Sequence, residues 1–204
     1  MLKIALTKGR IERGAVELLT RAGYGLSQLR DPGRRLIFDS DEGALRLVLA
    51  KANDVVTYVG HGVCELGVVG RDTILETGAQ CYEVADLGFG KCSFALAGVA
   101  GRDFFGGYEH HTVATKYPNV AKNYFSKLGM DVKIVKIDGS VELAPLLGLA
   151  DAIVDIVETG STLRENGLEV YERIEPVSAR LIVNIAAMKL RREEIGEFVE
   201  RLKL

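Results

Sequence analysis

The stretch AIVDIVETGSTL, residues 152–163, decides the fold class. Six largely apolar residues lead into a turn of threonine, glycine and serine, and a helical pattern follows. This order predicts a buried strand that runs into a helix. Similar apolar runs precede helical patterns at residues 3–7, 66–69 and 112–115. Short apolar strands that alternate with helices predict parallel βα units, and therefore an α/β fold.

The alternation extends along the chain in two series. In the first, we expect strands at residues 3–7, 36–38, 45–50 and 66–69 and helices at 11–22, 54–59 and 71–76. In the second, we expect strands at 92–99, 112–115, 132–137, 152–157 and 179–187 and helices at 118–128, 143–147, 162–165 and 191–204. Between the two series, the segment DLGFGK at residues 86–91 has two glycines around an aromatic residue, which predicts a crossing between two lobes.

The two series also resemble each other in sequence. Each has an apolar strand that ends in a Thr-Lys pair, Thr7-Lys8 in the first and Thr115-Lys116 in the second. This echo predicts two similar lobes with a ligand cleft between them, at the carboxyl ends of the parallel strands. The loop and helix at residues 155–167 are about four residues longer than those at 70–78. Because functional residues are concentrated in loops, we expect the chemistry there.

Composition restricts the class of protein. Of the 204 residues, 48% are hydrophobic and 26% are charged, which is typical of a folded globular protein. The formal net charge of -2 argues against a nucleic-acid-binding protein, since such proteins are usually basic. Three cysteines without a CxxC pair, and three histidines without a second ligand at suitable spacing, predict neither a disulfide framework nor a metal site. We see no signal peptide or membrane-spanning run and expect a cytoplasmic protein.

The turn at Thr159, Gly160, Ser161 and Thr162 predicts a phosphate cradle. Three hydroxyls and the unpaired amides at the start of a helix offer hydrogen-bond donors to a ligand at this turn, and the helix dipole adds partial positive charge there. Asp155 lies within the preceding apolar strand, where a buried carboxylate is costly unless it is paired or used. Ribose hydroxyls are suitable donors to it. The alternative is an ordinary helix start, with Ser161 or Thr162 as its N-cap.

Two further turns have a similar character. Lys8, Gly9 and Arg10 follow a strand and open a helix, so two cations beside helix amides could hold a pyrophosphate. Gly70, Arg71 and Asp72 follow another strand in the same way. The alternatives are solvated charges at the first turn and a helix-dipole partner at Asp72. Three such turns on neighbouring strands favour a phosphorylated ligand more than any one of them does.

The sequence resembles the ATP phosphoribosyltransferase family. The segments IDGSVELAP (137–145) and GLADAIVDIVETGSTLRENGL (148–168) are similar to the long signature of that family. Shorter similarities lie at residues 6–10, 66–72, 86–92 and 114–119, and the resemblance covers residues 3 to about 188. It implies two α/β lobes like those of a type II periplasmic binding protein. The first lobe would hold residues 1–88 and 178–204, and the second residues 89–177.

The resemblance implies a reaction and a set of site residues. The enzyme would condense ATP with 5-phosphoribosyl 1-pyrophosphate to N1-(5-phosphoribosyl)-ATP and pyrophosphate, the first step of histidine biosynthesis, with Mg²⁺ bound to the substrate. In the second lobe, Thr159, Gly160, Ser161 and Thr162 would hold the 5-phosphate, and Asp155 and Glu142 the ribose hydroxyls. In the first lobe, the catalytic Lys8 and Arg10, with Gly9, would face the pyrophosphate and the triphosphate, and Lys51 and Asp72 the nucleotide.

The sequence departs from the family pattern in two places. Val56 stands where we expect proline, which should change the start of a helix and not the chemistry. The chain also stops at Leu204, before the histidine-binding regulatory domain of the long members. The short form of the family works with a regulatory subunit that resembles histidyl-tRNA synthetase. We therefore expect a homodimer within a hetero-oligomer, no nucleic-acid or membrane partner, and no histidine binding by this chain alone.

Two other classes of protein remain open at this point. A type I phosphoribosyltransferase also ends a strand in an acidic TGxT loop, but its loop carries two adjacent acids, and here Ile156 follows Asp155. A two-lobed module that binds small anions without catalysis would share the fold. An assay for phosphoribosyl-ATP separates that module from the enzyme.

Overall fold

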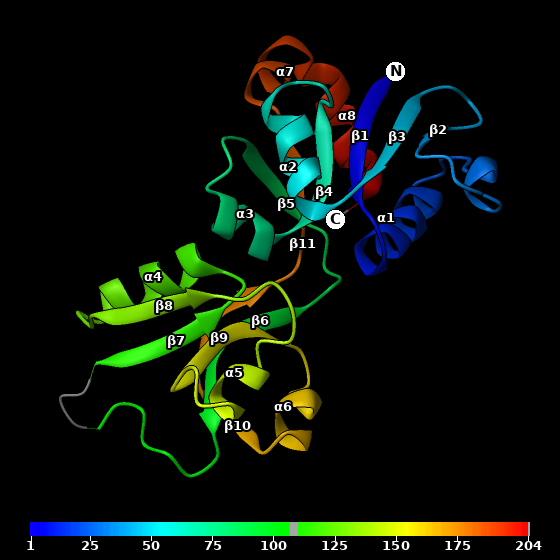
Figure 1. Ribbon diagram of the computed structural model, residues 1–204. Coiled ribbons are helices and arrows are strands. Elements are labelled where there is room, and N and C mark those ends of the chain that lie inside the picture. The colour runs from blue at the N-terminus through cyan, green and yellow to red at the C-terminus, as the bar shows by residue number, and fades with distance from the viewer. Residues whose placement is uncertain (107–109, 204) are drawn as a thin grey trace. The chain divides into compact units, whose positions relative to one another are not determined.

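The computed structural model describes residues 1–106 and 110–203, which divide into two compact units. The first unit comprises residues 1–90 and 178–204, and the second comprises Lys91–Val177. Each unit has its own sheet, and Figure 1 shows helices packed against both sheets. Within the described residues, no helix is long and apolar enough to cross a membrane.

The sheet of the first unit has the strand order β2-β3-β1-β4-β11-β5. Its strands are β1 (Leu2–Thr7), β2 (Ile37–Asp39), β3 (Leu45–Ala50), β4 (Leu66–Gly70), β5 (Tyr82–Asp86) and β11 (Ala179–Val183). The three central strands β3, β1 and β4 are parallel. β11 is antiparallel to both β4 and β5, and β2 is antiparallel to β3. The late strand β11 therefore lies between two strands from the first half of the chain.

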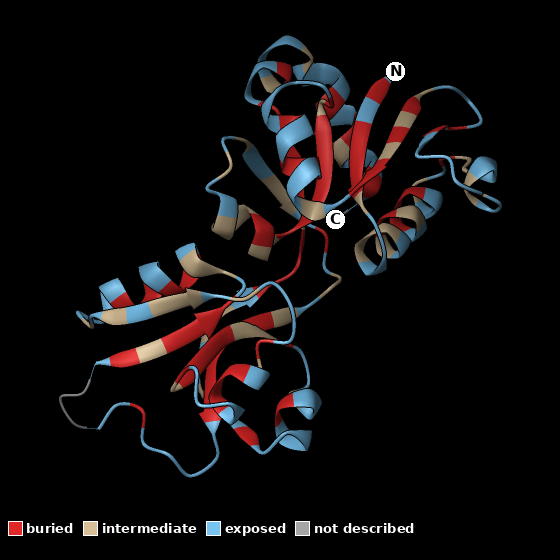
Figure 2. Cartoon of the chain, viewed as in Figure 1, coloured by how far each residue is buried: buried red, intermediate tan, exposed pale blue. Residues whose placement is uncertain are grey.

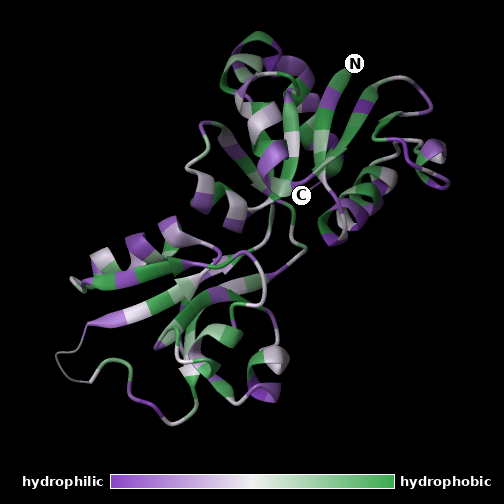
Figure 3. Ribbon diagram, viewed as in Figure 1, coloured by the Kyte–Doolittle hydropathy of each residue, from purple (hydrophilic) through white to green (hydrophobic). Residues whose placement is uncertain are grey.

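Helices cover both faces of this sheet. They are α1 (Arg10–Arg21), the 3₁₀ turn η1 (Ser27–Leu29), α2 (Ala52–Gly60), α3 (Arg71–Thr77), α7 (Ile185–Leu190) and α8 (Arg192–Leu202). Successive side chains of a strand point to opposite faces, so Ile4 and Leu6 pack in one cluster with α1 and α8. Ala5 packs in a second cluster, with the α2 residues Val55 and Val59. The buried positions concentrate on the central strands, and hydrophobic residues follow them (Figures 2 and 3).

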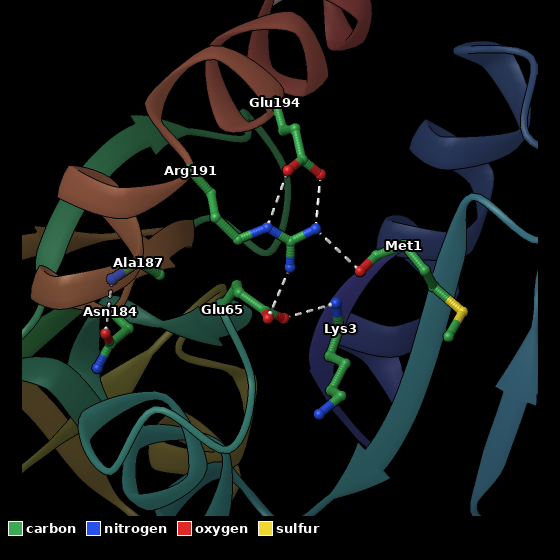
Figure 4. A network of polar contacts seen from close by, with 7 residues as sticks. All are labelled: Met1, Lys3, Glu65, Asn184, Ala187, Arg191 and Glu194. Carbon is green, nitrogen blue, oxygen red and sulfur yellow. Dashed lines mark hydrogen bonds and ion pairs between the residues drawn. The ribbon is translucent and has the colours of Figure 1, made fainter.

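A polar network joins the two chain segments of the first unit (Figure 4). Arg191, between α7 and α8, donates to Oε1 of Glu65 at 2.7 Å and to the carbonyl oxygen of Met1 at 3.1 Å. Its guanidinium also pairs with Glu194. The second oxygen of Glu65 accepts from the amide of Lys3 at 2.8 Å. One arginine therefore links the start of β1, the start of β4 and the C-terminal helices.

The sheet of the second unit has the order β10-β6-β9-β7-β8. Its strands are β6 (Cys92–Val99), β7 (His111–Thr115), β8 (Val132–Lys136), β9 (Ala152–Val157) and β10 (Leu168–Val177). Its helices are α4 (Pro118–Lys127), α5 (Leu143–Leu146) and α6 (Ser161–Glu165). β7 is parallel to β8 and β9, while β6 is antiparallel to β9 and β10. Ala144 of α5 and Leu163 of α6 pack in one cluster with Ile153 of β9.

The two sheets share one strand arrangement. The order β3-β1-β4-β11-β5 in the first unit corresponds to β8-β7-β9-β6-β10 in the second, with the same parallel and antiparallel neighbours. The Thr-Lys pairs lie at the ends of the central strands β1 and β7. Thr7 donates its hydroxyl to the carbonyl of Val68 at 3.0 Å, and Thr115 donates to Val154 at 2.6 Å. The echo in the sequence is thus matched by the topology.

The structure differs from the sequence expectations mainly near the C-terminal part of the first unit. The strand expected at residues 179–187 stops at Val183, because Asn184 starts helix α7. The Asn184 side chain accepts from the amide of Ala187 at 2.9 Å and donates to the carbonyl of Val59 at 2.8 Å. The strands β5 and β10 were not expected. Helix α2 begins at Ala52 rather than residue 54, and Val56 is buried within it.

Candidate functional site

The loop between β9 and α6 consists of Glu158, Thr159 and Gly160. Gly160 has φ 72° and ψ 12°, a left-handed conformation that favours glycine. The hydroxyls of Thr159 and Ser161 lie 3.1 Å apart, and the Ser161 amide donates to the Thr159 hydroxyl at 3.3 Å. Arg164 donates from Nη1 to the Thr159 carbonyl at 3.0 Å. Contacts within the loop and α6 therefore fix its path.

The ordinary-cap interpretation of this turn is wrong. The N-cap of α6 is Gly160, which has no side chain, and the cap position receives no side-chain hydrogen bond. Ser161 and Thr162 are the first two residues of the helix, and both are exposed. Their hydroxyls are therefore on the surface beside the loop, where a ligand can reach them.

Six of the predicted site residues line one cavity of the second unit. Its volume is about 250 Å³, and its lining residues are Glu142, Asp155, Ile156, Val157, Glu158, Thr159, Gly160, Ser161, Thr162 and Leu163. Glu142 is the N-cap residue of α5, and Asp155 comes from β9. The loop hydroxyls thus share a small cavity with three carboxylates, those of Glu142, Asp155 and Glu158, and this combination of groups suits a phosphorylated sugar.

Two larger cavities lie in the first unit and contain none of the predicted residues. One, of about 410 Å³, lies among α1, α8 and the segment from Asp86 to Gly88. The other, of about 510 Å³, lies between β5 and the region of α7 and α8. We base the candidate site on the smaller cavity, because it gathers hydroxyls and carboxylates from three elements, whereas size alone does not identify a ligand.

Asp155 is half-buried rather than fully buried, since it lines the cavity. Burial is the main cause that raises the pKa of its carboxyl group, to about 6. The Ile156 amide donates to Oδ1 at 2.8 Å and acts in the opposite direction. The charge of Glu142 raises the pKa further, and the charge of Lys116 lowers it. Asp155 therefore holds a proton more readily than an exposed aspartate does, because its burial and the charge of Glu142 disfavour the carboxylate.

In the first unit, Lys8, Gly9 and Lys51 follow the ends of two neighbouring parallel strands. The register pairs Thr7 with Ala50, and the Lys8 amide donates to the Ala50 carbonyl at 2.9 Å. Lys8 and Lys51 are therefore the next residues at the same edge of the sheet. Gly9 has φ 96° and ψ -129°, which a residue with a β-carbon rarely adopts.

The turn after β1 is less open than the sequence suggests. The amide of Gly9 donates to the carboxylate of Glu12 at 3.1 Å, so this donor already has an anionic partner. Arg10 is the first residue of α1. An incoming phosphate would therefore meet the Glu12 carboxylate together with the cations Lys8 and Arg10, and the Gly9 amide would have to leave its present acceptor to bind it. Glu12 was not among the expected site residues. It lies three residues after the N-cap Gly9, the position that glutamate has in a capping box.

The third predicted turn follows β4, the other neighbour of β1. Gly70 is the N-cap of α3, and Asp72 lies in its first turn, with a 3.4 Å contact to the Thr73 hydroxyl. The register pairs Leu6 with Val68, so Asp72 follows the strand end beside Lys8 and Arg10. The structure therefore gathers the five predicted residues of the first unit at the carboxyl edge of three adjacent strands.

Comparison with known sequences decides the family. The family model "HisG: ATP phosphoribosyltransferase" matches residues 51–204. An ATP phosphoribosyltransferase of Clostridium kluyveri is 58% identical over 203 residues, which cover 100% of this chain and 93% of the relative. The chain belongs to the ATP phosphoribosyltransferase family. A further member, from Clostridium acetobutylicum, is 52% identical, and the similarity covers 99% of this chain and 94% of the relative.

Solved structures agree with membership in this family. The complex described as "ATP phosphoribosyl transferase (HisG:HisZ) complex from Thermotoga maritima" includes a chain with a TM-score of 0.86 and 33% identity, with 100% of this chain and 97% of that chain covered. The periplasmic aliphatic sulphonate binding protein SsuA from Escherichia coli has a TM-score of 0.62 at 14% identity, covering 98% and 67%, which shows the fold alone. The expected family and the expected resemblance to periplasmic binding proteins are both confirmed.

Proposed function

We propose that this chain catalyses the reaction of the ATP phosphoribosyltransferase family, the transfer of a phosphoribosyl group from phosphoribosyl pyrophosphate to N1 of ATP. This is the first step of histidine biosynthesis. The observation that carries the proposal is the cavity of the second unit, where the Thr-Gly-Ser-Thr loop lies with Glu142 and Asp155 in a member of this family. A type I phosphoribosyltransferase and a module that only binds anions are both less consistent with the family match.

The cavity of the second unit would bind the phosphoribosyl group. The hydroxyls of Thr159, Ser161 and Thr162 and the amides at the start of α6 would donate to the 5-phosphate. The carboxylates of Asp155 and Glu142 would accept hydrogen bonds from the ribose hydroxyls, and hydrogen bonds to a charged acceptor are stronger than neutral ones. Gly160 keeps the loop backbone clear of a side chain at this point.

The edge of the first unit would supply the cations for the pyrophosphate and the triphosphate. Lys8 and Arg10 would stabilise the negative charge that develops on the leaving pyrophosphate, and Lys51 and Asp72 would contact the nucleotide. Adenine N1 carries no proton that has to be removed before it attacks C1 of the ribose. The reaction therefore needs no general base, and catalysis would rest on positioning and on neutralisation of the leaving group.

Mg²⁺ would arrive with the phosphorylated substrate. The cavity is lined by three carboxylates, those of Glu142, Asp155 and Glu158, which are fewer oxygen ligands than an octahedral Mg²⁺ ion requires. An ion that reaches the site would therefore be held mainly by phosphate oxygens of the substrate and by water. The ion would neutralise charge on the pyrophosphate as it leaves.

The proposal includes a domain arrangement and a partner. We assign the nucleotide-binding lobe to residues 1–88 and 178–204 and the phosphoribosyl-binding lobe to residues 89–177. The solved relative from Thermotoga maritima is a HisG:HisZ complex, which supports a regulatory subunit that resembles histidyl-tRNA synthetase for this chain as well. We propose a homodimer within that hetero-oligomer. A cytoplasmic location is part of the proposal, because ATP is available there.

A spectrophotometric assay for phosphoribosyl-ATP tests this function. The purified chain receives ATP, phosphoribosyl pyrophosphate and Mg²⁺, with and without the regulatory subunit. We expect product from the wild type, and much less from Lys8→Ala under the same conditions. Calorimetric binding of phosphoribosyl pyrophosphate without product in either mixture would support the anion-binding module and contradict the proposal.

A further inference from the structure

Arg164 of α6 donates to two carbonyl groups of the loop that precedes this helix. Its guanidinium donates from Nη1 to the Thr159 carbonyl at 3.0 Å, and its backbone amide donates to the Gly160 carbonyl at 3.1 Å. Arg164 is not one of the described residues that line the cavity of the second unit. Both carbonyl oxygens are therefore directed to a residue outside the cavity lining.

The Thr159 carbonyl and the Gly160 amide belong to the same peptide group. Because a trans peptide is planar, its C=O and N–H bonds point in opposite directions. The hydrogen bond that holds the Thr159 carbonyl toward Arg164 therefore directs the Gly160 amide away from Arg164. Gly160 lines the cavity, and among the described residues its amide has no hydrogen-bond acceptor. This amide is thus open to a ligand.

Gly160 alone does not fix the orientation of this peptide. Its φ is 72°, and a half-turn of the peptide between Thr159 and Gly160 would make that angle negative, which glycine adopts about as readily. In the rotated form, the Thr159 carbonyl would point where the Gly160 amide points now. The present orientation therefore depends on a contact from outside the glycine, and Arg164 supplies it.

The orientation matters because the charged residues of the cavity lining are all acidic. They are Glu142, Asp155 and Glu158. None of them offers a cation to a phosphate, so a phosphate in this cavity depends on hydroxyl and amide donors. A carbonyl oxygen in place of one amide would remove a donor and add partial negative charge.

We propose that Arg164 is a positioning residue for this loop, which keeps the Thr159 carbonyl out of the cavity and directs the Gly160 amide into it, toward a phosphate. The role rests on the proposed function, in which the phosphate is the 5-phosphate of phosphoribosyl pyrophosphate. Arg164 itself does not contact the ligand. Because its side chain is exposed, a substitution leaves the core of the second unit intact.

NMR of the free protein tests the orientation of the peptide. Thr-Gly pairs occur only at Thr77-Gly78 and Thr159-Gly160, so isotope labels on threonine carbonyl carbons and glycine nitrogens select these two peptide groups. We expect Arg164→Met to move the signal of the Thr159–Gly160 peptide and to leave that of Gly78, in the first unit, unchanged. An unchanged Thr159–Gly160 signal would overturn the proposal.

Calorimetry with phosphoribosyl pyrophosphate and Mg²⁺ tests the effect on binding. We expect Arg164→Met to bind about fivefold more weakly than the wild type, since the loop has lost the support of one hydrogen bond. The control is Lys127→Met, which removes a cation from the last turn of α4, as Arg164→Met does from the last turn of α6. Equal affinity in Arg164→Met and Lys127→Met would contradict the positioning role.

A double variant distinguishes positioning from direct contact with the phosphate. Gly160→Ala acts on the same peptide, because alanine disfavours the positive φ of the present orientation. If Arg164 acts through this peptide, combining Arg164→Met with Gly160→Ala should weaken binding no further than the more harmful single substitution does. If Arg164 contacts the phosphate, the two losses should multiply to about 25-fold, and the positioning role would be wrong.

Inorganic phosphate separates this inference from the proposed function. It is added to the labelled protein, and the Gly160 amide signal is followed. If phosphate moves this signal at several-fold lower concentration in the wild type than in Arg164→Met, while the wild type binds no phosphoribosyl pyrophosphate, the proposed function is wrong and the role of Arg164 stands. If the wild type binds phosphoribosyl pyrophosphate and Arg164→Met binds it equally well, the function stands and the role of Arg164 is wrong. A wild type that binds neither ligand would overturn both.

Discussion

The turns after β4 and β9 occupy corresponding places in the two sheets, yet they differ in length and contents. After β4, which ends at Gly70, helix α3 begins at once with Arg71. After β9, three residues intervene before α6, and a cavity of about 250 Å³ lies between this loop, β9 and the start of α5. The strand arrangement is the same, so the pocket at the second turn goes with its longer loop and with Glu142 at the start of α5.

The charges at the two edges differ as well. The carboxyl edge of the first sheet has the cations Lys8, Arg10 and Lys51 near Asp72. The cavity of the second sheet has only carboxylates as charged lining residues, those of Glu142, Asp155 and Glu158. Cations suit phosphates, and carboxylates suit ribose hydroxyls. In the proposed reaction, the first unit therefore binds the pyrophosphate and triphosphate groups, and the carboxylates of the second unit bind the ribose hydroxyls.

The largest effect on turnover is expected from a substitution of Lys8, at the carboxyl end of β1. Lys8→Ala should lower kcat on the order of 100-fold, the usual range for removing one group that stabilises charge in the transition state. Lys3→Ala is the matched control, because it removes a lysine at the opposite end of β1. Steady-state assays with both substrates decide the matter. Turnover of Lys8→Ala within a few-fold of the wild type would mean that this edge does not act on the leaving group.

The next effect concerns the carboxylates of the second edge. Asp155→Asn should weaken the binding of phosphoribosyl pyrophosphate by about 1–3 kcal/mol, the range for hydrogen bonds to charged groups. The binding of ATP to the free enzyme should change less. Calorimetric titration of each ligand measures both. Equal losses for the two ligands would mean that Asp155 stabilises the fold of the second unit. The proposed division, in which the first unit binds phosphates and the second binds the ribose, would then have no support from this residue.

Asp155→Asn should weaken ligand binding but increase the stability of the folded protein. The pKa of Asp155 is about 6 in the folded protein against 3.8 in the unfolded chain, so the folded state binds the proton more tightly. Between pH 4 and 7, rising pH therefore destabilises the wild type relative to Asp155→Asn, by about 1–2 kcal/mol after allowance for partial exposure. Urea unfolding at several pH values measures the difference. Asp138→Asn, which replaces an exposed carboxylate of the same unit, is the control variant.

The smallest effect isolates the inserted loop. Gly160 and Gly167 have nearly the same left-handed φ, 72° and 71°, so alanine at either position should cost about 1 kcal/mol of stability. A β-carbon at residue 160 would lie 3.3 Å from Nη1 of Arg164, which holds the Thr159 carbonyl, whereas one at residue 167 meets open space. Only Gly160→Ala should weaken phosphoribosyl pyrophosphate binding, by roughly fivefold. Equal binding of phosphoribosyl pyrophosphate by both variants would mean that the loop at Gly160 does not contact this ligand.

The strands that the sequence predicted well are those in which apolar residues predominate. The bounds of β3, β6 and β9 agree with expectation, because most of their residues are apolar and buried, with single polar residues such as Arg46 and Asp155 among them. The edge strands β5 and β10 were missed. Much of β5 is exposed, and the ladder between β10 and β6 has two register shifts, so neither strand carries a regular apolar pattern. The edge position of a strand depends on its neighbours in the sheet, which a local pattern does not contain.

The site was predictable to the extent that it is local. The Thr-Gly-Ser-Thr turn is contiguous in sequence, so its four residues could be proposed as one site before their positions were known. The neighbour relation between Lys116 and Asp155 was not predicted, because it depends on the pairing of β7 with β9, residues about forty apart. The pairing of Glu12 with the Gly9 amide was also missed, and here the capping pattern was visible in the sequence.

The position of β11 has a consequence for the order in which the protein folds during synthesis. β11 lies between β4 and β5, so the first sheet stays divided until Val183 has left the ribosome. The second unit, Lys91–Val177, is one continuous segment and ends only six residues before β11 does. Domains generally fold as units, so the strands that begin the chain cannot complete their sheet until the second unit and β11 have both been made.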